Sequence, residues 1–292
     1  MATVEASTTA PVRRDAAAAV PTNRIRTTVV LVVLLAVSFV VLLPFLWMLS
    51  ASVRTAGDFG AHPSALFPHA FTLRNYVSIW SAIPIGRMLL NTTIFAVVVT
   101  AGSVLFDSMA GYALARFDFP GKKVVFLVII STLMLPFQAT LIPVFKLLTD
   151  IGWVNTYQGL IVPRLADAFG IFFMRQFFIS LPQDLEQAAR IDGAGELRIF
   201  AQIMAPLAVP AYLTISLFNL LANWNDLLWP LVLTNSTSMQ TLTVGLSLFK
   251  GQHATDYGLL MTGSLLALAP MVVAFLLVQR KFVEGIATTG VK

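Results

Sequence analysis

Long apolar runs alternate with short polar stretches along most of this chain. A membrane-crossing helix needs about 20 mostly apolar residues. Six runs reach that length, at residues 27–49, 88–113, 124–148, 157–179, 203–233 and 257–278. Charged residues fall mainly between the runs. The pattern predicts an all-α integral membrane protein with six transmembrane helices.

Prolines interrupt several of these runs. Pro136 and Pro143 lie in the third run and Pro163 lies in the fourth, so we expect kinked helices there. The fifth run is too long for one straight crossing. We expect it to begin as an interfacial helix before Pro206 or Pro210.

The two ends of the chain differ from the apolar runs. Residues 1–26 are rich in Ala, Thr and Pro without periodicity, which predicts a disordered tail. The first run is too long for the core of a secretory signal and lacks a convincing cleavage site, so we expect it to be retained. The predicted organisation is a tail at 1–26, a six-span transmembrane domain at 27–280 and a second tail at 281–292.

Composition supports a membrane protein. Hydrophobic residues make up 57% of the chain and charged residues only 11%, whereas a soluble domain carries about 25% charged residues. The net charge of +5 is spread near the ends of the runs rather than gathered on one face. We therefore expect contact with membrane lipid and no nucleic-acid partner.

The distribution of basic residues predicts the orientation. Six spans place both termini on one side, and short basic loops stay in the cytoplasm. The more basic side carries Arg13, Arg14, Arg24, Arg26, Arg116, Lys122, Lys123, Arg190, Arg198, Arg280, Lys281 and Lys292. The other side carries Arg54, Arg74, Arg87, Lys146 and Lys250. We expect a multi-pass protein with cytoplasmic termini and with loops 50–87 and 235–256 facing outward.

A charged segment, residues 181–210, separates the fourth and fifth runs. Ser180 followed by Leu181-Pro182 predicts a helix start, and the helix should stop at Asp192-Gly193. A second helix is expected over residues 196–204. Such a pair of short helices is either a connector that lies on the lipid headgroups or a docking site for a soluble partner.

Motifs in this segment and elsewhere resemble a known family. EQAARIDGA at residues 186–194, followed by IMAP at 203–206, resembles the "EAA" loop of bacterial ABC importer permeases. The form DLEQAARIDGAGELRIF is similar to the maltose-type carbohydrate branch. Further segments similar to that branch follow the same order along the chain: FVVLLPFLWMLSASVRT, FTLRNY, GYALARFDFPGKK, ANWNDLLWPLVL and QRKFVEGIATTGVK.

The resemblance covers nearly the whole chain from Val29 onward and implies a type I ABC importer permease fold. It implies one half of a pathway for a di- or oligosaccharide or a related polyol, in the plasma or inner membrane. The implied partners are a homologous second permease subunit, a dimer of cytoplasmic ABC ATPase subunits and an extracytoplasmic sugar-binding protein. A cytoplasmic coupling helix, in a loop at about 181–204, would dock on the ATPase. The motif residues carried over to that role are Glu186, Gln187, Ala188, Ala189, Asp192, Gly193 and Ala194.

The sequence departs from the family motif at one important position. Aligned on Gly193, the glutamate of the motif falls at Gln187, and Glu186 lies one residue earlier. A helix turns about 100° per residue, so Glu186 does not replace it on the same face. We expect a neutral hydrogen bond from Gln187 to the ATPase instead of an ion pair. Ala205 also replaces the leucine usual before the closing proline.

The sequence lacks the motifs for nucleotide binding, metal binding and catalysis. The chain has no G-x-x-x-x-G-K-[ST] loop, so ATP and Mg²⁺ are expected on the partner ATPase, with no cofactor in this chain. It contains no cysteine, and His62, His69 and His253 lack metal-ligand spacing, so we expect ordinary loop residues and no metal site. No catalytic residue set is evident, which disfavours an enzyme. No internal repeat and no carboxylate relay is evident in the sequence, which disfavours a secondary transporter.

Polar residues in the fifth run are candidates for the substrate pathway. Asn219, Asn223, Asp226 and Pro230 recur on one face of a helix, and polar groups at membrane depth face protein or water. An aromatic ring beside amides also suits a sugar. The candidate pathway residues are Asn219, Asn223, Trp224, Asn225 and Asp226. The alternative is that they only bond neighbouring helices.

Other charges in the apolar runs have structural expectations. Arg164 and Asp167, three residues apart, are expected to form a structural ion pair. Asp107 and Arg175 are expected near the ends of spans, where charged side chains reach the interface.

Overall fold

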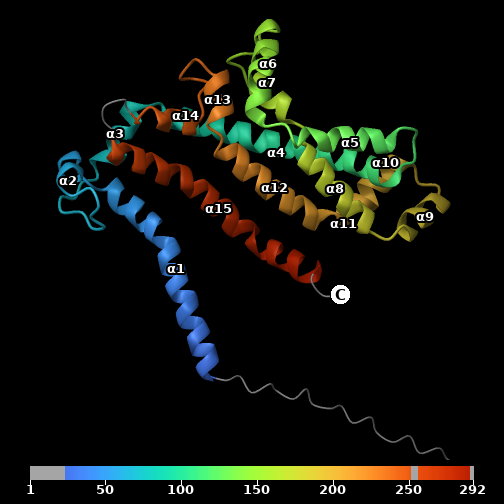
Figure 1. The fold of residues 1–292 in the computed structure, drawn as a ribbon, viewed down its shortest axis with the longest axis horizontal. Helices are drawn as coiled ribbons and strands as arrows, with labels where there is room; N and C mark the ends of the chain where they lie inside the picture. The colour runs from blue at the N-terminus through green and yellow to red at the C-terminus, as the bar shows by residue number, and fades with distance from the viewer. Residues whose placement is uncertain (1–23, 251–255, 290–292) are drawn as a thin grey trace, which may run out of the picture. The chain divides into compact units, whose positions relative to one another are not determined.

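The computed structural model describes residues 24–250 and 256–289, and these ranges are helical (Figure 1). They contain no β-strand, only an isolated antiparallel bridge between Arg54 and Phe71. The longer elements are α1 (Arg24–Ser52), α3 (Arg74–Ala82), α4 (Ile85–Arg116), α5 (Lys122–Thr132), α6 (Phe137–Asp150), α8 (Ala168–Ser180), α9 (Asp184–Ile191), α12 (Val209–Trp224) and α15 (Tyr257–Thr289). Shorter ones are α2 (Ala56–Ala61), α7 (Tyr157–Ile161), η1 (Val162–Arg164), α10 (Glu196–Ile199), η2 (Phe200–Met204), α11 (Ala205–Leu207), α13 (Leu228–Leu233) and α14 (Leu242–Ser247).

The chain divides into two compact units, Met1–Trp47 and Met48–Lys292. In the first unit, the described part is helix α1, which contains Pro44. Its side chains from Arg26 to Leu42 are exposed, as expected for an apolar helix surrounded by lipid. The tail predicted at residues 1–26 lies almost entirely outside the described residues, because the description begins at Arg24.

The number of spans depends on how bent helices are counted. Among the described residues, 3 helices are long and apolar enough to cross a membrane, or up to 6 if each bent pair forms one span. The sharpest bend, 99°, separates α5 from α6, with Pro136 immediately before α6. Pro163 lies in η1, where the fourth predicted run leaves α-helical geometry. The kink predicted at Pro136 is confirmed, whereas Pro163 lies in a 3-10 turn and Pro143 lies inside α6.

Helix α4 is at the centre of the second unit, packed against α8 and α12 (Figure 1). Its buried residues recur every three or four positions, including Met88, Phe95 and Val99. Small residues allow the close helix approach: a Cβ on Gly111 would lie 2.8 Å from the backbone nitrogen of Arg175. The buried face of α4 therefore packs against the helices α8 and α12.

The fifth predicted run is not one helix. A π-helix, η2, and α11 precede α12, which ends at Trp224; α13 follows from Leu228. The side chain of Asp226 accepts a hydrogen bond from the backbone nitrogen of Trp229 at 3.2 Å. Such side-chain bonds compete with helical ones, which accounts for the break at residues 225–227.

The last helix, α15, runs from Tyr257 to Thr289 and contains Pro270. It continues past residue 278, where the sixth span was predicted to end. The tail expected at 281–292 therefore begins inside a helix, because loss of apolar character does not by itself end helical backbone geometry.

Candidate functional site

The charged segment forms a helical elbow, defined here as residues 184–199. Helix α9 ends at Ile191, and Gly193 adopts φ +79° with no atom within 4 Å of an added Cβ. Glycine takes this left-handed conformation without the penalty of a side chain. The predicted helix–turn–helix is confirmed, with its turn at the position expected for Gly193.

The start of the elbow differs from the prediction. Ser180 is the last residue of α8, and its hydroxyl bonds to the carbonyl of Phe177. Leu181 is extended (ψ 146°) because the following Pro182 disfavours helical geometry before it. Helix α9 therefore begins at Asp184, without a side-chain cap.

Glu186 points into the protein rather than toward solvent. Its side chain is 3% exposed, and its Oε1 lies 2.9 Å from Nε of Arg116, which is also 3% exposed. Besides this ion pair, Nη2 of Arg116 donates a hydrogen bond to the carbonyl of Leu181 at 2.7 Å. Burial raises the pKa of Glu186, opposed by the charges of Arg116 and Arg190. This ion pair ties the elbow to the end of α4.

The predicted docking residues divide between two faces. Glu186 and Ala189 are buried against the same subunit, which corrects the expectation that they lie on the docking face. Gln187, Ala188, Asp192 and Gly193 are exposed, and Ala194 is half-buried. Two exposed apolar residues missed from the sequence extend this face, Ile191 and Leu197, at 86% and 78% exposure. The sequence could have indicated them, because each of these two apolar residues stands between two charged residues.

A buried apolar cluster joins the elbow to three long helices. We call it the elbow cluster, formed by Tyr112, Met174, Phe178, Ala189, Ile199, Met204, Ala208, Ala211 and Ile215. Close-packed protein interiors transmit a displacement rather than absorb it. The elbow therefore shares one buried cluster with α4, α8 and α12.

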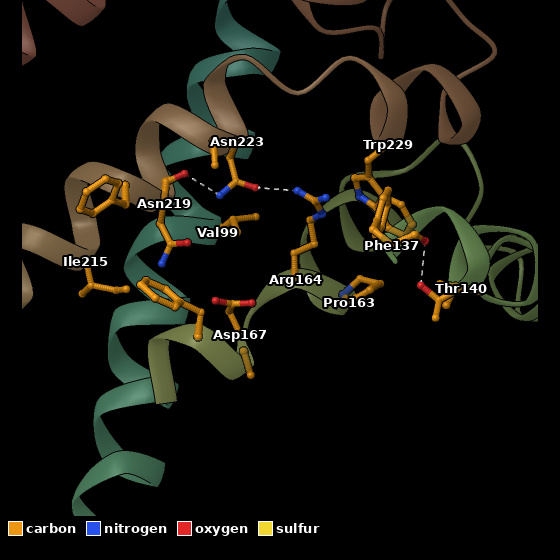
Figure 2. A pocket seen from close by; sticks show the side chains of 15 residues that line it. Val99, Phe137, Thr140, Pro163, Arg164, Asp167, Ile215, Asn219, Asn223 and Trp229 are labelled. Carbon is orange, nitrogen blue, oxygen red and sulfur yellow. Dashed lines mark hydrogen bonds between the residues drawn. The ribbon is translucent and has the colours of Figure 1, made fainter. Parts of the chain in front are cut away.

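A cavity of about 610 Å³ adjoins the elbow cluster (Figure 2). Its lining is contributed mainly by α6, the η1–α8 segment and α12, with Ile215 shared with the elbow cluster. The lining residues are Val99, Phe137, Thr140, Val144, Pro163, Arg164, Ala166, Asp167, Phe169, Ile215, Phe218, Asn219, Ala222, Asn223 and Trp229.

Hydrogen bonds link the polar lining residues into a row (Figure 2). Arg164 donates to Oδ1 of Asn223 at 3.0 Å, and Asn223 donates to the carbonyl of Asn219 at 2.8 Å. Asn219 in turn donates to the hydroxyl of Ser103 at 3.1 Å. Ser103 donates to Asp107 at 2.6 Å. Asn219 and Asn223 therefore line the cavity and also bond neighbouring helices, and their part in a substrate pathway stays a prediction.

Two predictions about charged residues are wrong. Arg164 pairs with Asp226 at 2.8 Å, not with Asp167. The helical spacing fails because η1 ends at Arg164, and Asp167 instead caps α8 by accepting from Gly170 at 3.1 Å. Asp107 is fully buried within α4, not near a span end. Its Oδ1 accepts from the backbone nitrogen of Asp167 at 2.8 Å.

The aromatic lining also differs from the prediction. Trp224 turns away and donates to the carbonyl of Ala267 on α15 at 3.1 Å, while Asn225 is exposed at the end of α12. The rings that line the cavity belong to Phe137, Phe169, Phe218 and Trp229. The guanidinium of Arg164 lies 5.1 Å from the ring centroid of Phe137 and 5.6 Å from that of Trp229. Trp229 follows the helix break, which periodicity does not reveal.

These features define a class of protein. Apolar helices surround a cavity with polar side chains in its wall, and the elbow shares a buried cluster with those helices. Such features are typical of a membrane transport subunit. Residues 107–285 match the family described as the binding-protein-dependent transport system inner membrane component, and the chain belongs to this family.

Individual relatives agree with this assignment. The chain is 35% identical to the arabinooligosaccharides transport system permease protein AraQ of Halalkalibacterium halodurans, over 88% of this chain and 93% of that protein. It is 34% identical to the diacetylchitobiose uptake system permease protein NgcG of Streptomyces coelicolor, over 86% and 84%. It is 35% identical to the sn-glycerol-3-phosphate transport system permease protein UgpE of Yersinia pestis, over 77% and 83%.

A solved structure shares the fold. It is a bacterial ABC transporter involved in the import of the acidic polysaccharide alginate, with a TM-score of 0.77 and 24% identity, over 90% of this chain and 98% of that one. The predicted all-α fold of ABC importer permeases is confirmed. The chain is a membrane permease subunit of a binding-protein-dependent transport system.

Proposed function

We propose that this chain forms half of the translocation pathway of an ABC importer for a di- or oligosaccharide or a related polyol. It binds no ATP itself. ATP and Mg²⁺ act on a separate dimer of cytoplasmic ATPase subunits, on which the exposed face of the elbow docks. A homologous second permease completes the pathway, and an extracytoplasmic binding protein delivers the sugar to the outward loops. The termini and the elbow face the cytoplasm.

The observation that carries the proposal is the shared position of Ile215. This residue belongs to the elbow cluster and also lines the cavity. A push on the elbow therefore reaches α12, which also carries Asn219 and Asn223. Because packed contacts are bistable rather than continuously deformable, ATPase closure would switch the cavity between its two accessible sides.

The carbohydrate class rests on the relatives and on the cavity chemistry. AraQ and NgcG are named for the transport of arabinooligosaccharides and diacetylchitobiose. The cavity is lined by the amides of Asn219 and Asn223 and by the rings of Phe137 and Trp229. Sugar hydroxyls need such hydrogen-bond partners, while the apolar face of a sugar ring packs on an aromatic ring.

Replacing Gly193 by Asp is expected to release the ATPase. The substitution adds a charge and a side chain at the exposed turn, where φ is +79°. Loss of a central interface position costs about 2 kcal/mol or more, so the ATPase should co-purify at a small fraction of the wild-type yield. Gly121→Asp is the matched control, since Gly121 has φ +82° and equally open space. Equal ATPase recovery from both variants would refute docking at the elbow.

Cysteine labelling tests the pathway wall directly, because the chain contains no native cysteine. Ala222 lines the cavity and its neighbour Leu221 on α12 does not. We expect Ala222→Cys to react with a hydrophilic maleimide in membranes, with a rate that changes when ATP is added. Leu221→Cys should stay unreactive in lipid. Equal reactivity of the two cysteines would contradict a water-filled pathway along this face.

A further inference from the structure

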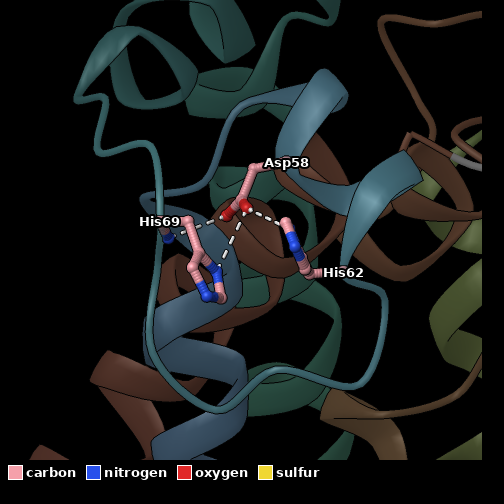
Figure 3. A group of neighbouring side chains, drawn as sticks. All are labelled: Asp58, His62 and His69. Carbon is pink, nitrogen blue, oxygen red and sulfur yellow. Dashed lines mark hydrogen bonds and ion pairs between the residues drawn. The ribbon is translucent and has the colours of Figure 1, made fainter.

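A cluster of three ligand-type side chains lies far along the chain from the cavity residues, in the loop between α1 and α3 (Figure 3). Asp58 and His62 lie four residues apart at the end of α2, which places them on one face. His69 reaches them from the returning loop. Their ligand atoms all lie within 4.8 Å of one another. Chain spacing alone did not show this cluster, and the prediction that His62 and His69 are ordinary loop residues stays a prediction.

The carboxylate of Asp58 has one oxygen that is hydrogen-bonded and one that is not. Its Oδ2 accepts from Nε of Arg54 at 2.7 Å and from the backbone nitrogen of His69 at 3.3 Å. Its Oδ1 is buried and has no hydrogen-bond partner among the described residues. The side chain is 2% exposed. A buried, unsatisfied carboxylate oxygen is costly, and this one faces both imidazoles (Figure 3).

The distances match a small metal site. Nδ1 of His62 lies 3.4 Å from Oδ1 of Asp58, and Nδ1 of His69 lies 3.5 Å from the same oxygen. Two ligands about 2.1 Å from a tetrahedral Zn²⁺ are about 3.4 Å apart. The two side chains are 51% and 57% exposed, so an ion can enter from solvent and the rings can adjust around it.

The surroundings hold the ligands in place. Arg54 is fully buried and donates to the carbonyls of Asp58, His62 and Ala65 as well as to the Asp58 carboxylate. It therefore fixes the helix end and the following loop. Outer contacts that orient a ligating carboxylate are typical of metal sites. The His62 and His69 rings stack with their centroids 4.2 Å apart.

We propose that Asp58, His62 and His69 bind a divalent transition-metal ion, with Zn²⁺ as the best match. Two imidazoles and one carboxylate suit Zn²⁺, whereas Mg²⁺ and Ca²⁺ prefer all-oxygen ligands. A water molecule would complete four-coordination. The ion would cross-link the end of α2 to the returning loop. The proposal is independent of the transport role and of the orientation in the membrane.

The test is a Zn²⁺ titration of the full-length chain. It is purified in detergent with its accompanying subunits through a tag without histidine, and it is stripped with a chelator. Zn²⁺ binding is measured by equilibrium dialysis with metal analysis. The double variant His62→Gln/His69→Gln gives the background from other sites. We expect one additional Zn²⁺ per chain in the wild type, and a rise in Tm that Mg²⁺ does not produce.

Single variants identify the ligands. His62→Gln and His69→Gln change half-exposed side chains, so they should fold, and each should weaken Zn²⁺ binding at least about tenfold. His253→Gln removes the remaining imidazole of the chain and should bind as the wild type does. The proposal is overturned if the wild type binds no more Zn²⁺ than the double variant. Unchanged affinity in either single ligand variant also overturns it.

Discussion

Replacing Glu186 by Ala is expected to destabilise the protein by about 3–5 kcal/mol, because it leaves the charge of Arg116 buried without a partner. Both side chains are 3% exposed. The variant should unfold at a markedly lower temperature in detergent. It should also retain less ATPase on purification, because the ion pair tethers the elbow to α4.

A double variant separates the charge from the packing. Burial raises the pKa of Glu186, because the charged carboxylate loses water that the nearby arginines replace only in part. An apolar pair at such a position is often as stable as the ion pair. We therefore expect Arg116→Leu/Glu186→Leu to recover most of the stability lost in Glu186→Ala.

The neighbouring residue provides the control for this prediction. Gln187 is exposed on the same helix, and Gln187→Ala should change stability by no more than about 0.5 kcal/mol. Thermal unfolding of the four proteins in one detergent is the measurement. If Glu186→Ala were as stable as Gln187→Ala, the anchoring role of the carboxylate would be refuted.

Glu186 and Gln187 show how much of the structure can be predicted from the sequence. The apolar runs, the prolines and Asp192-Gly193 act locally, so the bent helices and the turn of the elbow could be predicted. The motif comparison also showed correctly that the two residues face different directions. It did not show which direction is inward, because that depends on Arg116, 70 residues earlier in the chain.

The residues of the cavity also show that contacts between distant parts of the chain cannot be predicted from the sequence. Asn219 and Asn223 were found by helical periodicity, and both line the cavity. Trp224 was wrongly included because the sequence does not say that α15 supplies a carbonyl for its indole. Trp229 was missed because α12 ends between the two tryptophans. The spacing rule does not apply across such a break.

Replacing Arg164 by Met is expected to reduce uptake to near background. Arg164 pairs with Asp226 and bonds Asn223, and its guanidinium lies beside Phe137 and Trp229. Its loss leaves the carboxylate of Asp226 mostly buried without a cation, at a cost of about 3 kcal/mol. It also removes the donors that orient the polar lining. Uptake of labelled sugar in vesicles and Tm in detergent should both fall.

The double variant Arg164→Met/Asp226→Leu distinguishes a structural pair from a pathway residue. Because it leaves no unpaired charge, we expect its Tm to return toward that of the wild type. Uptake should stay low, because the donors of the guanidinium are still missing from the cavity wall. The matched control is Lys146→Met, which removes a cation from α6 at a position outside the cavity lining and should leave uptake unchanged. Recovery of uptake together with Tm in the double variant would show that Arg164 only holds the helices together. Recovery of neither would show that its part in the fold extends beyond the ion pair.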